Sequence, residues 1–324
     1  MLSWPSFALL KSQYPDAIIT ALVPEYTREL AKACKWIDEI IVDDKQSSRL
    51  SDIWTLRNNI SKGNFDYSIS LFSELRTSSA LWLAGVKQRF GPATKIAQLF
   101  LNRRLKQKRS KSEMPEYEYN LDLARHFIHS NGDSPVALPA PPYLQFDDAE
   151  TAGIRDKLLK DHDIADCKKL VILHPGTGGS AINLTLKQYA DMTSQMANRI
   201  ESYFIITAGP GEYEYAEKLS ELMAGTSHHV HNSTSGIIDF CKLIASCDLF
   251  IGGSTGPLHI AGALDTRTAA FYPAKRSATP LRWQTLNSPE NRIAFSPERH
   301  IDDDDMKTID TIEAANIIVN RFFY

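Results

Sequence analysis

A glycine-rich stretch near position 250 carries residue types that can bind phosphate. Three apolar residues precede three glycines, two hydroxyl side chains and a proline, in the order Leu249-Phe250-Ile251-Gly252-Gly253-Ser254-Thr255-Gly256-Pro257. This order predicts a short strand, a tight turn and a helix, because glycine permits the turn and proline suits a first helical turn. The N–H groups and the dipole of a helix start attract phosphate. An ordinary strand-to-helix turn of an α/β domain would show the same pattern.

Two more glycine-rich loops follow predicted strands in the same half of the chain. His174-Pro175-Gly176-Thr177-Gly178-Gly179-Ser180 comes after a predicted strand at 169–173. Ala208-Gly209-Pro210-Gly211-Glu212 comes after another at 203–207. Open α/β sheets bind ligands at the carboxyl ends of their parallel strands. We therefore expect the three loops to form one ligand site.

The elements around these loops alternate between strand and helix. In the second half we predict further strands at 228–231 and 268–272, and helices at 186–199, 212–223, 237–245 and 312–322. In the first half we predict strands at 17–23, 37–42 and 67–72, with helices at 3–14, 24–34, 48–61, 75–83 and 116–129. This alternation is typical of parallel α/β domains. Because the first element is a helix, we expect one more strand and its loop before Met1.

A proline-rich stretch, 135–142, separates the two halves and is typical of a stiff linker. We place the domain boundary between 148 and 149, with a linking helix at 149–160. The expected organisation is a first domain at 1–148, a second at 149–306 and a terminal helix at 307–324. The order Asp310-Thr311-Ile312-Glu313 has the form of a capping box and predicts the start of that helix.

Composition excludes several classes of protein. A net charge of −3 argues against a nucleic-acid binder, and no apolar run approaches the ~20 residues of a membrane span. No secretory signal is visible at the start. The four cysteines are scattered without metal-ligand spacing, which predicts reduced thiols of a cytoplasmic protein (Cys34, Cys167, Cys241, Cys247).

Two charged or titratable segments admit more than one interpretation. Residues 95–111 are rich in Lys and Arg and interleaved with Leu99, Phe100, Leu101 and Leu105. A solvated face is the usual reason for such a run, but an amphipathic segment at a membrane surface would look alike. His229 and His231 share one face of the predicted 228–231 strand. We expect a solvated strand there rather than a metal site.

Taken in order, these motifs resemble glycosyltransferase family 9, the ADP-heptose:lipopolysaccharide heptosyltransferases. The stretch 245–263 is similar to the family's signature strand, loop and helix. Leu173-His174-Pro175-Gly176, Ala208 to Glu212, and the segment from Phe65 to Gly91 resemble its other motifs, and Pro5 to Val23 its first helix and second strand. The resemblance covers nearly the whole chain.

The resemblance implies a GT-B fold, in which two doubly wound Rossmann-like α/β domains face each other across a cleft. The N-terminal domain would bind the acceptor, the C-terminal domain the nucleotide sugar, and the last helix would cross back to the N-terminal domain. The implied reaction is an inverting transfer without metal or cofactor. A sugar, heptose in the family, would move from an ADP-sugar to the lipopolysaccharide inner core or a related surface glycan. The implied place is the cytoplasmic face of the inner membrane, with peripheral contact to anionic lipid.

The resemblance also implies residue roles. The donor would be bound by Thr177, Gly178, Glu212, Ser254, Thr255, Gly256, Pro257, Leu258 and His259. Glu214 would replace Glu212 if the register shifts, and His259 could instead pack under its loop. The acceptor would be bound by the basic segment, through Arg103, Arg104, Lys108 and Arg109.

Three departures from the family pattern concern charged groups. The family's catalytic base is an aspartate in a loop that would here precede Met1, so no residue is assigned as catalytic. Ser254 stands where the family usually has an aspartate, and Ile182, with Asn183 beside it, where it often has a lysine. An alternative is therefore a catalytically impaired relative that binds a nucleotide sugar or glycan without transferring it. A weaker third reading is a GT-B enzyme of other chemistry, such as a nucleotide-sugar epimerase.

Overall fold

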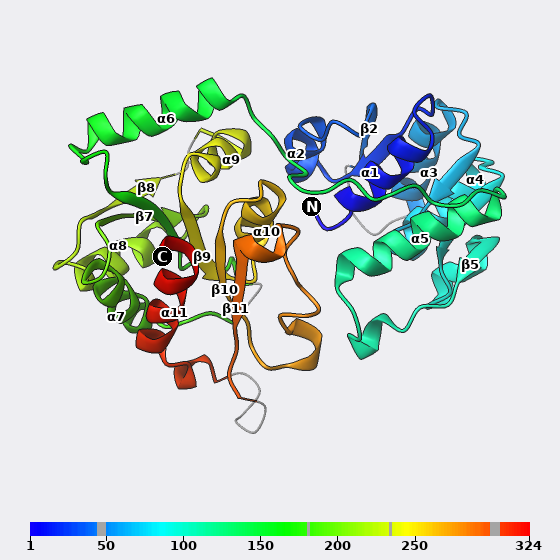
Figure 1. Ribbon diagram of the computed structural model, residues 1–324. Coiled ribbons are helices and arrows are strands. Elements are labelled where there is room, and N and C mark those ends of the chain that lie inside the picture. The colour runs from blue at the N-terminus through cyan, green and yellow to red at the C-terminus, as the bar shows by residue number, and fades with distance from the viewer. Residues whose placement is uncertain (44–49, 180–181, 233–234, 299–304) are drawn as a thin grey trace. The chain divides into compact units, whose positions relative to one another are not determined.

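The computed structural model describes residues 1–43, 50–179, 182–232, 235–298 and 305–324. The chain divides into two compact units, Leu2–Pro139 and Ala140–Tyr324, with Met1 grouped with the second (Figure 1). Each unit has its own parallel sheets and its own buried core, and each is described by itself.

The second unit is built on a parallel sheet of six strands in the order β11-β10-β9-β6-β7-β8. The strands are β6 (Lys169–His174), β7 (Ser202–Ala208), β8 (His228–Asn232), β9 (Leu249–Gly253), β10 (Thr268–Phe271) and β11 (Arg292–Phe295). β6 pairs with β9 on one side and with β7 on the other. The three strands that precede the glycine-rich loops are therefore neighbours in the middle of the sheet.

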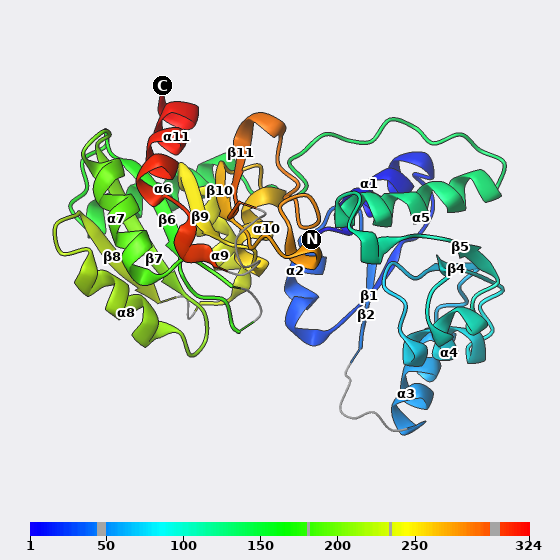
Figure 2. The ribbon, with the colours of Figure 1, turned by 90° about the horizontal axis from the view of Figure 1, so that it is seen from below.

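Helices cover both faces of this sheet (Figures 1 and 2). One layer holds α7 (Leu186–Ala197), α8 (Tyr213–Leu222) and α11 (Thr311–Phe323), and the other holds α6 (Asp148–Asp161), α9 (Ile237–Ala245) and α10 (Gly256–Ala263). Alternate strand residues such as Val171, Leu173 and Phe204 form one fully buried cluster with the first layer. The strands are apolar on both faces because both faces are covered.

The last helix, α11, begins where its sequence signal predicts. Asp310 is the N-cap, and its Oδ1 accepts hydrogen bonds from the N–H groups of Ile312 and Glu313 at 2.9 and 3.0 Å. The apolar stripe that includes Ile318 and Phe322 packs into the core of the second unit, beside α7. A crossing of this helix to the first domain stays a prediction, but its apolar stripe is used within its own unit.

The division between the units lies after Pro139, ahead of the predicted boundary at 148/149. The reason is that residues 140–148 are bonded to the second unit. The N–H groups of Tyr143 and Leu144 donate to the carbonyl of Ala263 at 2.7 and 2.9 Å. In α6, which follows, Arg155 pairs with Asp248 at 3.0 Å.

The first unit contains two separate parallel sheets, β1-β2 and β3-β4-β5. The strands are β1 (Thr20–Val23), β2 (Glu39–Val42), β3 (Tyr67–Ile69), β4 (Gln88–Pro92) and β5 (Arg103–Leu105). The helices are α1 (Trp4–Gln13), α2 (Arg28–Lys32), α3 (Leu50–Ser61), α4 (Leu75–Leu83) and α5 (Glu116–Ser130). Small cores lie between α3 and α4, around Leu56 and Leu81, and between α1 and α5, around Leu9 and Leu121.

The basic segment is not one amphipathic element. It forms a 3₁₀ turn, η2 (Ile96–Phe100), then the strand β5 and a second turn, η3 (Arg109–Lys111). Leu101 is 2% exposed and belongs to the core, so it cannot lie on an outer apolar face. The strand is hard to predict because it has three residues and begins with two arginines.

The strand β8 is not a solvated strand, contrary to expectation. The ring of His229 stacks on His162 with 3.7 Å between centroids, and neither of its nitrogens has a hydrogen-bond partner among the described residues. Burial is the main cause that lowers the pKa of His229 to about 3, so this ring is neutral at pH 7.

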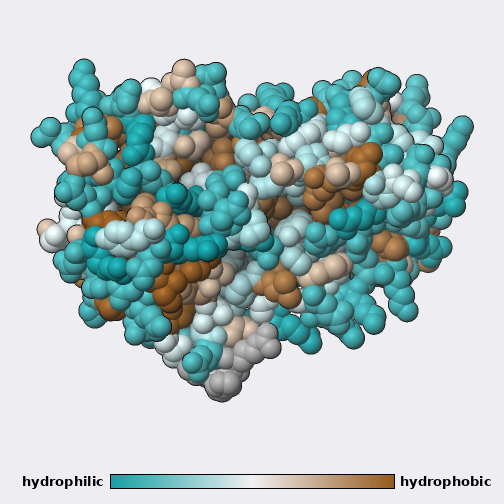
Figure 3. Space-filling view, in the orientation of Figure 1, coloured by the Kyte–Doolittle hydropathy of each residue, from teal (hydrophilic) through white to brown (hydrophobic). Residues whose placement is uncertain are grey.

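The surface is that of an ordinary globular chain. Figure 3 shows a mostly hydrophilic face with scattered hydrophobic patches. Among the described helices, none combines the length and apolar character that crossing a membrane requires.

Candidate functional site

Three loops meet at the carboxyl edge of the six-stranded sheet, as the sequence predicts. His174, the last residue of β6, is aligned with Gly252 of β9. A Cβ atom on Gly253 would lie 2.8 Å from Cγ of Asn183, so the turn after β9 lies against the loop after β6. The loop after β7 lies on the other side of β6, because β6 and β7 are paired.

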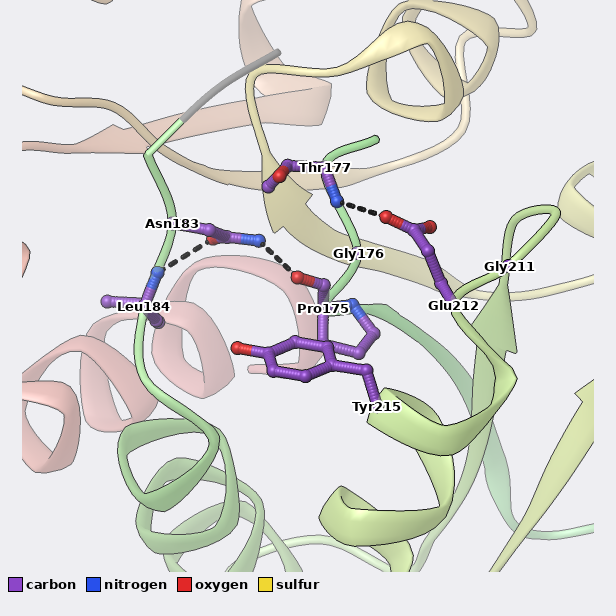
Figure 4. Close-up of a pocket in the computed structure, with 8 residues that line it drawn as sticks. All are labelled: Pro175, Gly176, Thr177, Asn183, Leu184, Gly211, Glu212 and Tyr215. Atoms are coloured by element: carbon purple, nitrogen blue, oxygen red, sulfur yellow. Dashed lines mark hydrogen bonds between the residues drawn. The ribbon is translucent and has the colours of Figure 1, made fainter. Parts of the chain in front are cut away.

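The carboxylate of Glu212 joins the loops after β6 and β7. Its Oε1 accepts a hydrogen bond from the N–H of Thr177 at 2.8 Å (Figure 4). The same oxygen accepts another from the N–H of Gly178 at 2.6 Å. Its Oε2 accepts one from the N–H of Gly209 at 3.2 Å. A Cβ at Gly176 would lie only 2.1 Å from that oxygen, so this close approach requires glycine. Glu212 therefore fixes the shape of the glycine-rich loop after β6.

A pocket of about 360 Å³ lies between these loops (Figure 4). It is lined by Pro175, Gly176, Thr177, Asn183, Leu184, Gly211, Glu212 and Tyr215. Glu212 lines the pocket and Glu214 does not, so the assignment of Glu212 to the donor stays a prediction that the position of its side chain allows. Six of these eight lining residues were not among the predicted donor residues: Pro175, Gly176, Asn183, Leu184, Gly211 and Tyr215.

Asn183 holds the far wall of this pocket in place. Its Nδ2 donates to the carbonyl of Pro175 at 3.0 Å, and its Oδ1 accepts from the N–H of Leu184 at 2.8 Å. The hydroxyl of Tyr189, from α7, donates to the same Oδ1 at 3.0 Å. The side chain of Asn183 is thus hydrogen-bonded inside the loop, whereas the neighbouring Ile182 is 39% exposed.

The start of α10 is open toward its surroundings. Thr255 is the N-cap residue, but its side chain makes no capping hydrogen bond. A Cβ on Gly256 would meet no described atom within 4 Å. The first N–H groups of this helix thus keep the character of an anion site.

The other predicted residues of this turn differ in what they can contribute. Ser254 is half-buried, while the side chain of Leu258 is fully buried and anchors the helix. Leu258 can therefore offer a ligand only its N–H, and Pro257 has no N–H to offer.

His259 is the fourth residue of α10, and its ring is neutral at pH 7. Burial is the main cause that lowers its pKa to about 4. Its Nδ1 is buried without a hydrogen-bond partner among the described residues, and its ring centroid lies 6.3 Å from that of Trp283. The geometry suits a histidine packed under the loop, and a neutral ring brings no positive charge to the site at pH 7.

The side chain of His174, which ends β6 just before the glycine-rich loop, is held by a hydrogen bond to Thr207. Thr207 Oγ1 donates to the carbonyl of Leu173 at 3.2 Å, so it accepts from Nδ1–H of His174 at 2.9 Å. Burial lowers the pKa of His174 to about 4, which keeps the ring neutral.

The predicted acceptor residues lie in the first unit. Arg103, Arg104 and Lys108 are exposed. Arg109 is instead used within the unit, because it pairs with Glu116 at 2.6 Å and also donates to Gln107 and to the carbonyl of Tyr119. The group of cations open to an acceptor therefore excludes Arg109.

A second pocket, of about 270 Å³, lies beside this basic segment. It is lined by Lys106, Gln107, Lys108, Glu113, Met114, Tyr119 and Asp122. Burial raises the pKa of Asp122. Across the described residues, no group of three or more His, Cys, Asp and Glu side chains is placed to hold a metal ion.

The site could be found from the sequence only in part. Tyr215, in the first turn of α8, lies three residues after the N-cap residue Glu212, and residues at that spacing lie on the same side of a helix start. The helical periodicity of α8 was thus a usable signal for it. Asn183 gave no comparable signal, because its partners come from the carbonyl of Pro175 and from α7.

Comparison with known proteins matches this chain to one family. The family model described as glycosyltransferase family 9 (heptosyltransferase) matches residues 53–308. A Haemophilus influenzae protein, named only as a candidate glycosyltransferase, is 41% identical over 297 residues, which is 92% of this chain and 85% of that protein.

Two solved Escherichia coli structures share the fold. ADP-heptose lipopolysaccharide heptosyltransferase II superposes with a TM-score of 0.72 at 17% identity, over 99% of this chain and 95% of that one. The heptosyltransferase WaaC, solved with ADP, superposes with a TM-score of 0.71 at 15% identity, over the same shares of the two chains. At these identities the likeness shows the fold, which is the GT-B class of two α/β units with parallel sheets.

Proposed function

This chain belongs to glycosyltransferase family 9, and from that premise we propose that it transfers a heptose-like sugar from an ADP-sugar to a lipopolysaccharide inner core or a related surface glycan. Membership in the family makes it a glycosyltransferase. The identity of the sugar, of the nucleotide and of the acceptor is the proposal.

The observation that carries the proposal is the meeting of the three loops at the carboxyl edge of the second sheet. The open start of α10 offers N–H groups and a helix dipole for a diphosphate. Beside it, the pocket between the loops after β6 and β7 has room for part of a nucleoside. WaaC, a structural neighbour, was solved with ADP, which supports ADP as the nucleotide.

The proposed chemistry breaks the bond between the sugar's anomeric carbon and the diphosphate. An acceptor hydroxyl oxygen attacks that carbon, ADP leaves with the bonding electron pair, and the hydroxyl proton passes to a base. Donors fixed in advance at the start of α10 stabilise the charge that develops on the leaving diphosphate. We assign the donor role to Thr177, Gly178, Glu212 and the turn from Ser254 to His259, and leave the base unassigned.

We propose that the acceptor is met by the first unit, through Arg103, Arg104 and Lys108, at the cytoplasmic side of the inner membrane. Exposed cations suit a phosphorylated glycan. Four free thiols suit a reducing compartment.

Calorimetric titration with ADP, UDP and GDP tests the donor assignment. We expect ADP to bind at one site per chain, and UDP and GDP to bind at least about tenfold more weakly, a difference of about 1.4 kcal/mol. Equal affinity for the three nucleotides, or none for ADP, contradicts the proposed donor.

A transfer assay then separates an active enzyme from a binding relative. The protein is incubated with ADP-heptose and a lipid A–Kdo acceptor, and ADP release and acceptor mass are measured together. We expect stoichiometric gain of one sugar per ADP released. Tight ADP binding with no mass gain would instead identify a nucleotide-sugar binder without transfer.

A further inference from the structure

The loop after β10 carries two exposed cations at the same edge of the sheet as the glycine-rich loops. β10 is parallel to β9, and Phe271 is aligned with Gly253, so the two strands end at the same level. A few residues further on, Lys275 and Arg276 are exposed, and Arg276 begins the 3₁₀ turn η4 (Arg276–Ala278). The sheet therefore brings a fourth loop, with positive charge, to its carboxyl edge.

Hydrogen bonds hold this loop beside the start of α10. Nε1 of Trp283 donates to the carbonyl of Ser277, in η4, at 2.8 Å. The hydroxyl of Tyr272 donates to the carbonyl of Trp283 at 3.0 Å. The ring centroid of Trp283 lies 6.3 Å from that of His259, and the first residue of α10, Gly256, is only about 4.5 Å further along the helix axis. η4 and the first turn of α10 are thus close neighbours.

The charge of Lys275 and Arg276 is not neutralised within the protein. Among the residues that the structure describes, neither side chain forms an ion pair or a hydrogen bond. The chain contains no Asp or Glu from 266 to 289. Arg155, by contrast, is paired with Asp248 at 3.0 Å. An anion at this edge of the sheet would therefore meet two cations without a partner.

The three glycine-rich loops themselves offer a diphosphate no positive side chain. The segments 174–180, 208–212 and 252–256 contain no Lys or Arg, and Ile182 adds none. The one charged side chain that lines the pocket is the carboxylate of Glu212. A diphosphate at the start of α10 would meet N–H groups and a helix dipole there, so a cation must come from another loop.

The order of the strands matches the order of groups in a nucleotide sugar. The strands β7, β6, β9 and β10 are consecutive neighbours in the sheet. The pocket lies between the loops after β7 and β6, and α10 starts after β9. A nucleoside in the pocket with its diphosphate at α10 therefore points the outer phosphate, which bears the sugar, toward the loop after β10.

We propose that Lys275 and Arg276 bind the outer, sugar-bearing phosphate of the nucleotide donor. This inference rests on the proposed function and adds two binding residues to its donor site. When the bond from the anomeric carbon to the phosphate oxygen breaks, that oxygen keeps the electron pair and becomes negatively charged. An ammonium and a guanidinium beside it stabilise this charge through charge-assisted hydrogen bonds.

Removing both charges tests the assignment. The variant Lys275→Gln/Arg276→Gln is compared with wild type by calorimetric titration with ADP, and AMP is measured by displacement of ADP. We expect ADP affinity to fall at least about tenfold, because charge-assisted hydrogen bonds are lost. AMP affinity should fall less than about twofold, because AMP lacks the outer phosphate. The charge-preserving variant Lys275→Arg/Arg276→Lys should bind ADP within about threefold of wild type.

A matched control removes the same charge from the opposite edge of the sheet. Lys157 and Lys160 are exposed on α6, whose carboxyl end leads to the amino end of β6. Lys157→Gln/Lys160→Gln should bind both nucleotides like wild type. Added salt should weaken ADP binding more steeply in wild type than in Lys275→Gln/Arg276→Gln, because the attraction is screened. An unchanged melting temperature without nucleotide shows that each variant is folded.

The possible results separate this inference from the proposed function. ADP binding by wild type that Gly256→Asp abolishes and Lys275→Gln/Arg276→Gln leaves intact overturns this inference alone. An equal loss of ADP and AMP affinity, or an equal loss in the α6 control, also overturns it, because the effect would then not belong to the outer phosphate. A wild-type protein that binds no ADP contradicts the proposed donor, and this inference with it.

Discussion

At the scale of single residues, the carboxylate of Glu212, the N-cap residue of α8, joins two glycine-rich loops. One carboxylate accepts three backbone N–H groups from two loops. We predict that Glu212→Gln lowers ADP affinity about fivefold, because the amide nitrogen cannot accept from a backbone N–H and one donor loses its partner, at about 1 kcal/mol. Titration calorimetry measures this. Glu214→Gln, on the same helix but outside the pocket, is the control and should bind ADP normally.

A substitution at Gly256 tests the start of α10 more directly. We predict that Gly256→Asp abolishes measurable ADP binding, because it places a carboxylate beside the proposed diphosphate. The fold should tolerate it, since a Cβ there meets no described atom within 4 Å and an acidic residue suits a first helical turn. Gly153→Asp in α6, equally open, is the control. ADP affinity that survives Gly256→Asp removes the turn from the donor site.

At the scale of elements, α7 depends on its first turn. Thr185 and Gln188 form a capping box, and Nε2 of Gln188 also donates to the carbonyls of Met306 and Ile309, ahead of α11. We predict that Thr185→Ala lowers the free energy of unfolding by about 1 kcal/mol. Urea unfolding measures it, with the exposed Ser194→Ala on the same helix as the control. A loss no larger than that of the control contradicts this role of the cap.

The same scale shows what the sequence could predict. α4 begins and ends at Leu75 and Leu83, as expected, because Gly85 stops a clear helical pattern. Three strands were missed: β4 at Gln88–Pro92, β5 at Arg103–Leu105 and β11 at Arg292–Phe295. β4 ends in Gly91 and Pro92, which strands disfavour, and the other two are short and begin with arginine. Such strands exist because a neighbouring strand supplies their hydrogen bonds, and that neighbour cannot be seen in local sequence.

The candidate site, too, could be predicted where local sequence patterns decide and not where distant partners do. The three glycine-rich loops were predicted to meet, because the ends of parallel strands share an edge. The network of Glu212 and the role of Asn183 were not, because their partners are up to 35 and 8 positions away along the chain. Arg109 was assigned to the acceptor from its charge alone, and its ion pair with Glu116 depends on the fold of η3 and α5.

At the scale of the whole molecule, two units with separate cores should respond separately to a ligand. We predict two transitions in differential scanning calorimetry, of which ADP raises only that of Ala140–Tyr324. At a hundred times its dissociation constant, ADP should stabilise that unit by about 2.7 kcal/mol. Gly256→Asp should remove the shift and leave both transitions in place. A single transition, or two that move together with ADP, contradicts independent units.

Because β6 lies between β9 and β7, the candidate site can form only after all three strands have been synthesised. Leu170 and Asp248, joined at the edge of this pairing, are 78 positions apart, and α10 follows β9 in the chain. During synthesis β6 and β7 emerge early, but β9, which brings the proposed phosphate-binding turn beside them, emerges last of the three. A ribosome-bound chain that ends before α10 already contains every residue that lines the pocket, but it lacks the helix start beside it. The nucleotide binding that we propose is thus a late event in the life of each new chain, because it requires the start of α10 and the long-range pairing of β9 with β6.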